Sequence, residues 1–132
     1  MPMAVSPDRR FLFIALRTEP SWFACLAIDG ANGTLTHLGN APAPNSAPYI
    51  STDRTGRFLL GAYNPEAEKE GRRTGWISVS AIGPHGHVQA PHQIIRTPPK
   101  THSILPDPSN RFAFVASCDG DAMVRYAFDA TT

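Results

Sequence analysis

The sequence predicts an all-β chain, on the basis of two observations. Short apolar segments are separated by turns, and the chain has 13 Pro and 10 Gly spread along its length. One strand-turn-strand unit also occurs three times, anchored at Phe11, Phe58 and Phe112, with a period of roughly fifty residues. Strand-rich repeats of this length are typical of propeller blades. We therefore expect a β-propeller fragment of about two and a half four-stranded antiparallel blades.

Each copy of the unit has the composition of a β-hairpin. An apolar strand leads into a tight turn of Ser, Pro, Asp, Gly, Thr or Asn, and an Arg-Phe pair opens a second strand whose alternate side chains can face a core. The three copies cover residues 4–15, 49–62 and 103–116.

A third strand is expected after each hairpin, because apolar residues alternate again in 22–28, 76–82 and 123–128. In the first repeat, Asn32-Gly33 then favours another tight turn. Four strands per repeat follow from this pattern. We expect one partial propeller domain over residues 1–132, with blade-like repeats near 1–48, 49–102 and 103–132.

So few blades leave apolar faces exposed. A propeller usually closes with four to eight blades, and an uncovered blade face is a route to self-association. The alternative fold is a β-sandwich with coincidentally similar hairpins. A further alternative is that several such chains assemble to complete one ring.

Composition argues against several classes of partner. The chain has 12 basic and 11 acidic residues, interleaved, so nucleic acid and membrane surfaces are not expected partners. Apolar runs such as Phe11–Leu16 are too short to cross a bilayer, and no signal-peptide pattern is found. We expect a soluble cytoplasmic protein, with Cys25 and Cys118 as reduced core residues.

Four segments together resemble a known family. They are Pro2–Phe13, the turn Tyr49-Ile50-Ser51-Thr52-Asp53, the motif Gly61-Ala62-Tyr63-Asn64, and Thr101-His102-Ser103. In this combination the chain resembles the lactonase family of seven-bladed β-propellers, which includes bacterial 6-phosphogluconolactonases and a fungal carboxymuconate cyclase. The polar insert at residues 65–73, which we expect to be a solvated loop, departs from the family pattern beside the third segment.

The resemblance implies an activity. It is the hydrolysis of a sugar lactone, 6-phosphoglucono-δ-lactone, in the pentose phosphate pathway, with a small-molecule substrate and no metal or organic cofactor. His102 would be the catalytic base or the group that polarises the carbonyl. The family's arginine and glutamate would lie in blades after Thr132, so we expect this chain to be inactive by itself. The alternative is a non-catalytic propeller that binds or scaffolds a partner.

Three further residues are candidates for substrate binding. Tyr63 and Asn64 end a strand with groups that can hydrogen-bond a sugar hydroxyl, or else serve as a packing aromatic and a turn residue. Arg17 follows an apolar strand and could bind a phosphate through two nitrogens, or be a solvated arginine.

Three histidines raise the question of a metal site. His85 and His87 flank a glycine in a segment with turn composition, and His92 follows five residues later. No cysteine or acidic residue lies nearby, so we expect no metal there.

Overall fold

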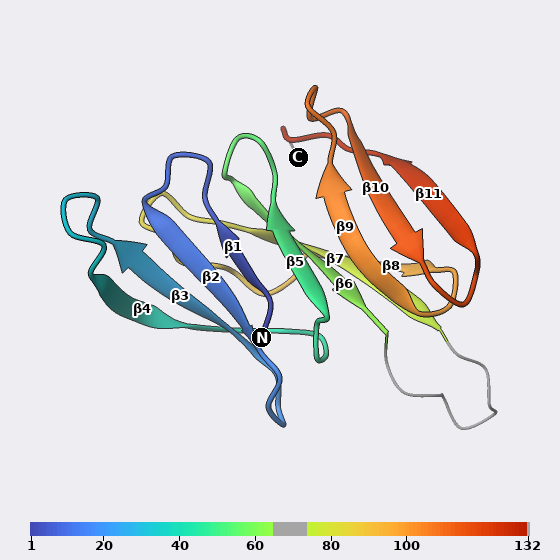
Figure 1. Cartoon of the computed structure of the whole chain (residues 1–132), viewed down its shortest axis with the longest axis horizontal. Coiled ribbons are helices and arrows are strands. Elements are labelled where there is room, and N and C mark those ends of the chain that lie inside the picture. The colour runs from blue at the N-terminus through green and yellow to red at the C-terminus, as the bar shows by residue number, and fades with distance from the viewer. Residues whose placement is uncertain (65–73, 132) are drawn as a thin grey trace.

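The computed structural model describes residues 1–64 and 74–131, and every regular element in these ranges is a β-strand (Figure 1). The insert at residues 65–73 lies outside the described residues. The strands are β1 (Met3–Val5), β2 (Phe11–Leu16), β3 (Trp22–Ile28), β4 (Leu35–Pro42), β5 (Tyr49–Thr52), β6 (Phe58–Tyr63), β7 (Gly75–Ala81), β8 (Gln93–Thr97), β9 (Thr101–Pro106), β10 (Phe112–Ser117) and β11 (Ala122–Ala127).

The strands form three antiparallel sheets that follow the order of the chain. The first is β1-β2-β3-β4, the second is β5-β6-β7-β8, and the third is β9-β10-β11. The sheets stand one after another, each facing the next (Figure 1). This confirms the prediction of an all-β propeller fragment. A sandwich of two sheets over one core does not describe it. The third sheet begins at Thr101, so His102 belongs to it.

The three hairpins have one register. Met3 pairs with Ile14 in the first sheet, Ile50 with Gly61 in the second, and Ile104 with Val115 in the third. The first strand of each sheet also lies beside its counterpart in the neighbouring sheet, β1 next to β5 and β5 next to β9. These strands are therefore the inner strands, and β4, β8 and β11 are the outer ones.

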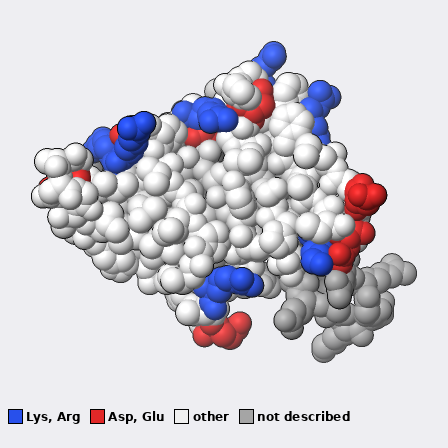
Figure 2. Space-filling view, in the orientation of Figure 1, with Lys and Arg blue, Asp and Glu red and all other residues white. Residues whose placement is uncertain are grey.

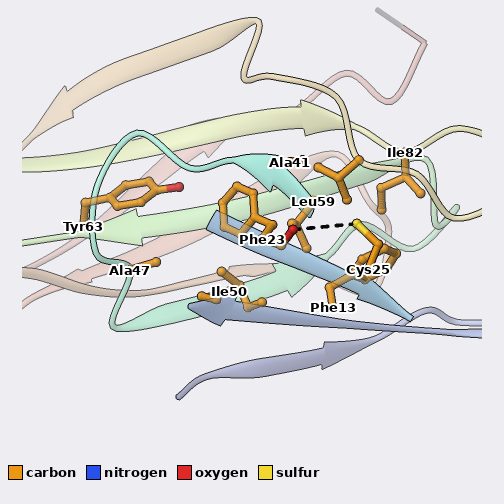
Figure 3. Close-up of a cluster of buried hydrophobic side chains, with 11 residues drawn as sticks. Phe13, Phe23, Cys25, Ala41, Ala47, Ile50, Leu59, Tyr63 and Ile82 are labelled. Atoms are coloured by element: carbon orange, nitrogen blue, oxygen red, sulfur yellow. Dashed lines mark hydrogen bonds between the residues drawn. The ribbon is translucent and has the colours of Figure 1, made fainter. Parts of the chain in front are cut away.

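The core consists of two apolar clusters, one between each pair of neighbouring sheets. Between the first and second sheets, Phe13 and Phe23 meet Ile50, Leu59 and Tyr63 (Figure 3). Between the second and third sheets, Leu60 and Ile77 meet Ile104, Ala113 and Val115. A fully buried side chain of this size contributes about 1.5–3 kcal/mol. The second sheet contributes to both clusters, which is why all of β6 is buried.

The two cysteines differ in their surroundings. Cys25 is buried in the first cluster, with its sulfur 4.0 Å from the Phe23 carbonyl oxygen (Figure 3). Burial raises the pKa of its thiol. Cys118 is exposed in the turn between β10 and β11. Both are free thiols, but the prediction that both are core residues is wrong for Cys118, because an alternating strand ends one residue before it.

The hairpin turns share one hydrogen-bond pattern. An oxygen at the first turn position accepts the backbone N–H of the Phe that opens the next strand: Asp53 Oδ1 from Phe58 at 2.9 Å and Asp107 Oδ1 from Phe112 at 3.0 Å. In each turn, a hydroxyl two residues later donates to the same carboxylate, from Thr55 and Ser109, both at 2.6 Å.

The first turn exchanges the two residue types. Ser6 Oγ accepts the Phe11 N–H at 3.0 Å and donates to Asp8 Oδ1 at 2.6 Å. The same hydroxyl-carboxylate pair is present with its members in reversed order. The geometry of the turn therefore depends on the pair and not on which position holds the charge.

The turns also connect the second sheet to the third. Asn110 Nδ2 donates to the buried Asp53 Oδ2 at 2.9 Å, and Asn110 Oδ1 accepts the Arg54 N–H at the same distance. Arg54 donates in addition to the carbonyl oxygens of Pro106 and Asp107. Because Asp53 and Arg54 are on one sheet and Asn110 is on the next, these bonds fix the two sheets at their turns.

One turn position is left-handed in all three copies. Its φ is +59° at Arg9, +73° at Gly56 and +59° at Asn110. Glycine and asparagine adopt this conformation readily, whereas arginine pays a steric penalty between its Cβ and the carbonyl oxygen.

We predict that Arg9→Asn raises the free energy of unfolding by about 1 kcal/mol, because the turn is kept and the strain is relieved. Chemical denaturation would measure it. Arg9→Ala removes the same charge but keeps the penalty, and should give no such gain. An equal increase in the free energy of unfolding in both variants would show that the effect comes from removing the charge of Arg9.

The buried Asp53 predicts a loss of stability in acid. Burial raises its pKa, but hydrogen bonds from Thr55, Asn110 and the backbone outweigh that effect and hold the pKa below the ordinary value of 3.8. A folded-state pKa below the unfolded one gives stability that is complete above the unfolded value and is lost as pH falls through the folded one.

Since an amide cannot accept all these donors, Asp53→Asn should lower the free energy of unfolding by about 1–3 kcal/mol at neutral pH. The loss should become smaller as the pH falls below the ordinary carboxyl value of 3.8. Denaturation at a series of pH values would measure the difference. Asp29→Asn, at an exposed acid that accepts one turn N–H, is the control. An equal cost at every pH would contradict the role assigned to the carboxylate.

Candidate functional site

Three of the four predicted site residues lie at one edge of the sheets. We call this the lower edge, meaning the end of each sheet at which β1, β5 and β9 begin (Figure 1). Strands alternate in direction, so the ends of β2 and β6 return to it. Arg17 follows β2, Asn64 follows β6, and His102 is the second residue of β9.

His102 lies on an inner strand at an irregularity in the pairing. Thr101 pairs with Ser117 and Ser103 pairs with Ala116, so His102 is the extra residue of a β-bulge. Its side chain is exposed. Bulges redirect a side chain at the rim of a sheet, and this one presents an imidazole at the lower edge.

The loop before His102 is held by several hydrogen bonds. Thr101, which is fully buried, donates through its hydroxyl to the Pro98 carbonyl oxygen at 3.0 Å and also bonds the Thr97 hydroxyl. Ser117 Oγ donates to the Pro99 carbonyl oxygen. The two prolines fix their own φ angles, so little freedom is left to the segment that precedes the histidine.

Lys100 completes the loop in a left-handed conformation. Its φ is +54°, its carbonyl oxygen accepts the Cys118 N–H at 3.1 Å, and its ammonium lies 3.3 Å from Asp119 Oδ1. Non-glycine residues in this region of φ persist where the surroundings determine them, and they cluster at functional sites. The structure thus places a cation two residues before His102.

Arg17 is exposed, and its Nε donates to Ser46 Oγ at 2.7 Å. Ser46 lies in the segment that leads into β5, so this bond joins the first sheet to the approach of the second. Figure 2 shows basic side chains at both edges of the molecule, with a broad surface without charged groups between them.

Tyr63 is in the core. Its side chain is fully buried and its hydroxyl lies 2.9 Å from Ser78 Oγ. Burial raises the pKa of the phenol, which stays neutral. Its ring lies over Gly61, where any Cβ would come within 2.4 Å of the hydroxyl oxygen. These contacts support the packing alternative for Tyr63 over direct substrate contact. Asn64 is half-exposed at the end of β6.

His102, Arg17 and Asn64 are contributed by three different sheets, and the hydrogen bonds described above join none of them to another. Sequence reasoning named His102 as a candidate, but it did not predict the contacts that Thr101, Ser117 and Lys100 make around the preceding loop. The Pro98-Pro99 pair is typical of a rigid loop, but nothing in the sequence singles out Thr101 and Ser117, whose hydroxyls bind its carbonyl oxygens.

The described part of the chain contains no group of three or more His, Cys, Asp or Glu side chains that could hold a metal ion. His85 and His87 are exposed in the β7–β8 turn, and the His92 ring lies tilted against the Phe58 ring, with ring centroids 5.9 Å apart. Within residues 1–64 and 74–131, no helix has the length and apolarity needed to cross a membrane.

Three consecutive antiparallel sheets, with inner strands side by side and polar groups at the edge where those strands begin, define a segment of a β-propeller. The whole chain, residues 1–132, matches the family model described as lactonase, 7-bladed beta-propeller. The chain therefore belongs to the lactonase family of seven-bladed β-propellers.

Named relatives support this assignment. A protein of Yersinia pestis (strain Pestoides F) named 6-phosphogluconolactonase is 39% identical over 115 residues, which cover 86% of this chain and 31% of the relative. The chain thus spans about a third of that relative's length.

Solved structures agree on the fold. The Pseudomonas aeruginosa periplasmic gluconolactonase has a TM-score of 0.79 at 17% identity. The aligned region is 96% of this chain and 38% of the gluconolactonase. Kuenenia stuttgartiensis hydrazine synthase has a TM-score of 0.66 at 18% identity, and the aligned region is 96% of this chain and 32% of the synthase chain. At these identities the likeness shows the fold alone, and the second name reminds us that one fold can serve different chemistry.

The loop before His102 requires a glycine on the neighbouring sheet. A Cβ at Gly75 would come within 2.2 Å of the Pro98 carbonyl oxygen and 2.4 Å of Thr101 Oγ1. We predict that Gly75→Ala costs about 1–3 kcal/mol of stability by overpacking and shifts the NMR resonances of His102. Gly30→Ala, where a Cβ meets nothing within 4 Å, is the control. An unchanged His102 spectrum in Gly75→Ala would show that the loop does not position the imidazole.

Proposed function

We propose that the chain forms part of a sugar-lactone hydrolase, of the 6-phosphogluconolactonase type, and supplies its catalytic histidine, His102. The observation that carries the proposal is an exposed imidazole on an inner strand, at a bulge fixed by Thr101 and Ser117. A base at a fixed position at the end of the inner strands is what water attack on a ring ester needs.

The chemistry follows from the groups present. A lactone is a cyclic ester, and its hydrolysis adds water to the carbonyl carbon and expels the ring oxygen. The neutral imidazole of His102 would take a proton from the attacking water and return it to the leaving ring oxygen. Proton transfer by a positioned group accelerates such steps by about 10²–10⁴.

Cations would hold the substrate. Arg17 lies at the same edge, and a guanidinium can bind two phosphate oxygens at once. Asn64 could hydrogen-bond a sugar hydroxyl. We assign Tyr63 an indirect role, since its buried ring packs the strand that ends at Asn64. The family's arginine and glutamate would come from blades that this chain does not contain.

Similarity supports the same proposal, since relatives at 39% and 35% identity, from Yersinia pestis and Erwinia tasmaniensis, are named 6-phosphogluconolactonase. We further propose a cytoplasmic location and a role in the pentose phosphate pathway, in keeping with a phosphorylated sugar substrate.

The purified chain should not hydrolyse 6-phosphoglucono-δ-lactone faster than the uncatalysed background, because two thirds of the ring and its further charged groups are missing. A spectrophotometric or NMR assay of lactone opening would test this. Turnover above background would overturn the requirement for later blades.

The role of His102 can be tested in a chimaera in which this chain replaces the matching third of the Erwinia tasmaniensis relative. His102→Gln should lower kcat by about 10²–10⁴. His87→Gln, at an exposed turn histidine in the β7–β8 connection, should leave kcat unchanged. A kcat that His102→Gln leaves unchanged would contradict the catalytic role of His102, and a chimaera that binds the lactone without hydrolysing it would favour the non-catalytic alternative.

A further inference from the structure

An ion pair lies close to His102 at the lower edge. Lys100 Nζ is 3.3 Å from Asp119 Oδ1, and the two side chains are 41% and 30% exposed. Lys100 comes from the loop between β8 and β9, and Asp119 comes from the turn between β10 and β11 (Figure 1). The Cys118 N–H joins these two connections by donating to the Lys100 carbonyl oxygen. The pair therefore belongs to the sheet that carries His102.

The backbone of Lys100 has a conformation that the repeat does not require. The left-handed residues Arg9, Gly56 and Asn110 share one turn position in all three copies, whereas Lys100 has no such counterpart. The segment that leads into β5, residues 43–48, contains no residue with a positive φ. Strained residues of this kind persist where their surroundings determine them, and they cluster at functional sites. The conformation thus distinguishes the loop before His102 from the equivalent segment of the second sheet.

Asn64 lies at the same junction between sheets. Arg17 and Asn64 hold equivalent positions in the repeat, directly after β2 and β6. Arg17 donates to Ser46, in the segment that leads into β5. Asn64 has the equivalent place at the next junction, where the segment that contains Lys100 leads into β9, and β6 lies beside β9. The second and third sheets therefore bring an amide and an ammonium to the end of the strand that carries the imidazole.

The proposed substrate has its phosphate near the reacting ester. In 6-phosphoglucono-δ-lactone, the carbonyl carbon and the carbon that bears the phosphomethyl group are both bonded to the ring oxygen. A base that directs water to the carbonyl therefore needs a phosphate-binding cation nearby. Two residues of extended chain span at most about 7 Å, so Lys100 and His102 are close enough to contact one small molecule.

The ion pair favours a phosphate over the carbonyl oxygen as the ligand of Lys100. A partly exposed pair contributes little stability, so the ammonium can exchange its carboxylate partner at little cost. A phosphate monoester carries a charge of about −1.5 to −2 at pH 7 and competes with the single charge of Asp119, whereas a neutral carbonyl oxygen does not. Lysine binds phosphate as a point charge on a flexible stem.

We propose that Lys100 selects a phosphorylated lactone, and that Asp119 is the counter-ion which the ammonium leaves when the phosphate binds. The inference rests on the proposed function and deepens it, because it assigns a second cation, besides Arg17, to the phosphate of the substrate. Lys100 acts in binding only, and the proton transfers stay with His102.

The test measures the binding of two sugars that differ only in the phosphate, in the chimaera described above. Glucose 6-phosphate and glucose keep a six-membered ring but contain no ester, so calorimetry gives each Kd without turnover. Lys100→Met should weaken the binding of glucose 6-phosphate about 10- to 100-fold and leave that of glucose unchanged. Lys100→Arg keeps the charge and should retain most of the affinity. Asp119→Asn removes the competing charge and should strengthen the binding of glucose 6-phosphate about two- to fivefold.

Arg10→Met is the matched control. It removes one positive charge from an exposed side chain in the β1–β2 turn, at the opposite edge of the sheets, and should leave both affinities unchanged. Kinetics give a second readout, in which Lys100→Met should raise the KM for 6-phosphoglucono-δ-lactone and leave kcat/KM for glucono-δ-lactone unchanged. Circular dichroism of each variant verifies the fold.

The outcomes separate this inference from the proposed function. Affinity for glucose 6-phosphate that is absent, or that does not depend on Lys100, would overturn the inference, and turnover by His102→Gln would still decide the role of the histidine. An equal loss of glucose binding in Lys100→Met, or an equal fall in kcat for both lactones, would also overturn it, because Lys100 would then act on the ring or the carbonyl. Lys100-dependent binding without any lactone turnover would support the inference and contradict the proposed hydrolysis.

Discussion

The structure depends on the packing of one apolar sheet face against the next. Each sheet is only three or four strands wide, too small to bury its own side chains, so its stability comes from its neighbours. The second sheet has a neighbour on both faces and contains the fully buried strand β6, whereas the first and third have one neighbour each. The same constraint explains the exposed Met3, Phe114 and Met123 on the outer faces of the first and third sheets, and it holds the inner strands side by side, which brings the candidate site residues to one edge.

Much of this architecture could be predicted from the sequence, for a physical reason. Strand periodicity and turn chemistry are local properties of the sequence. They are therefore enough to predict the hairpins anchored at Phe11, Phe58 and Phe112 and the strands that follow them. The exchange of serine and aspartate between Ser6-Asp8 and Asp53-Thr55 did not obscure the repeat, because both orders give the turn the same hydroxyl-carboxylate pair.

What the sequence could not provide is contact between side chains on different strands. Tyr63 has the composition of a sugar-binding residue, but its ring is buried because Gly61 leaves room for it and Ser78 receives its hydroxyl. Cys118 follows an apolar strand but lies in an exposed turn. The positioning of His102 by Thr101 and Ser117 likewise arises only when β9 and β10 pair. His102 itself became a candidate through family resemblance, since an exposed histidine carries no periodic pattern, and its role stays a prediction.

Amide hydrogen exchange at low protein concentration tests the central claim most directly, because it reports protection strand by strand. If coverage by neighbouring sheets sets stability, β6 and β7 should exchange most slowly, and the strands of the first and third sheets should exchange faster. Uniform protection across all three sheets, or slowest exchange in the first or third, would contradict the account.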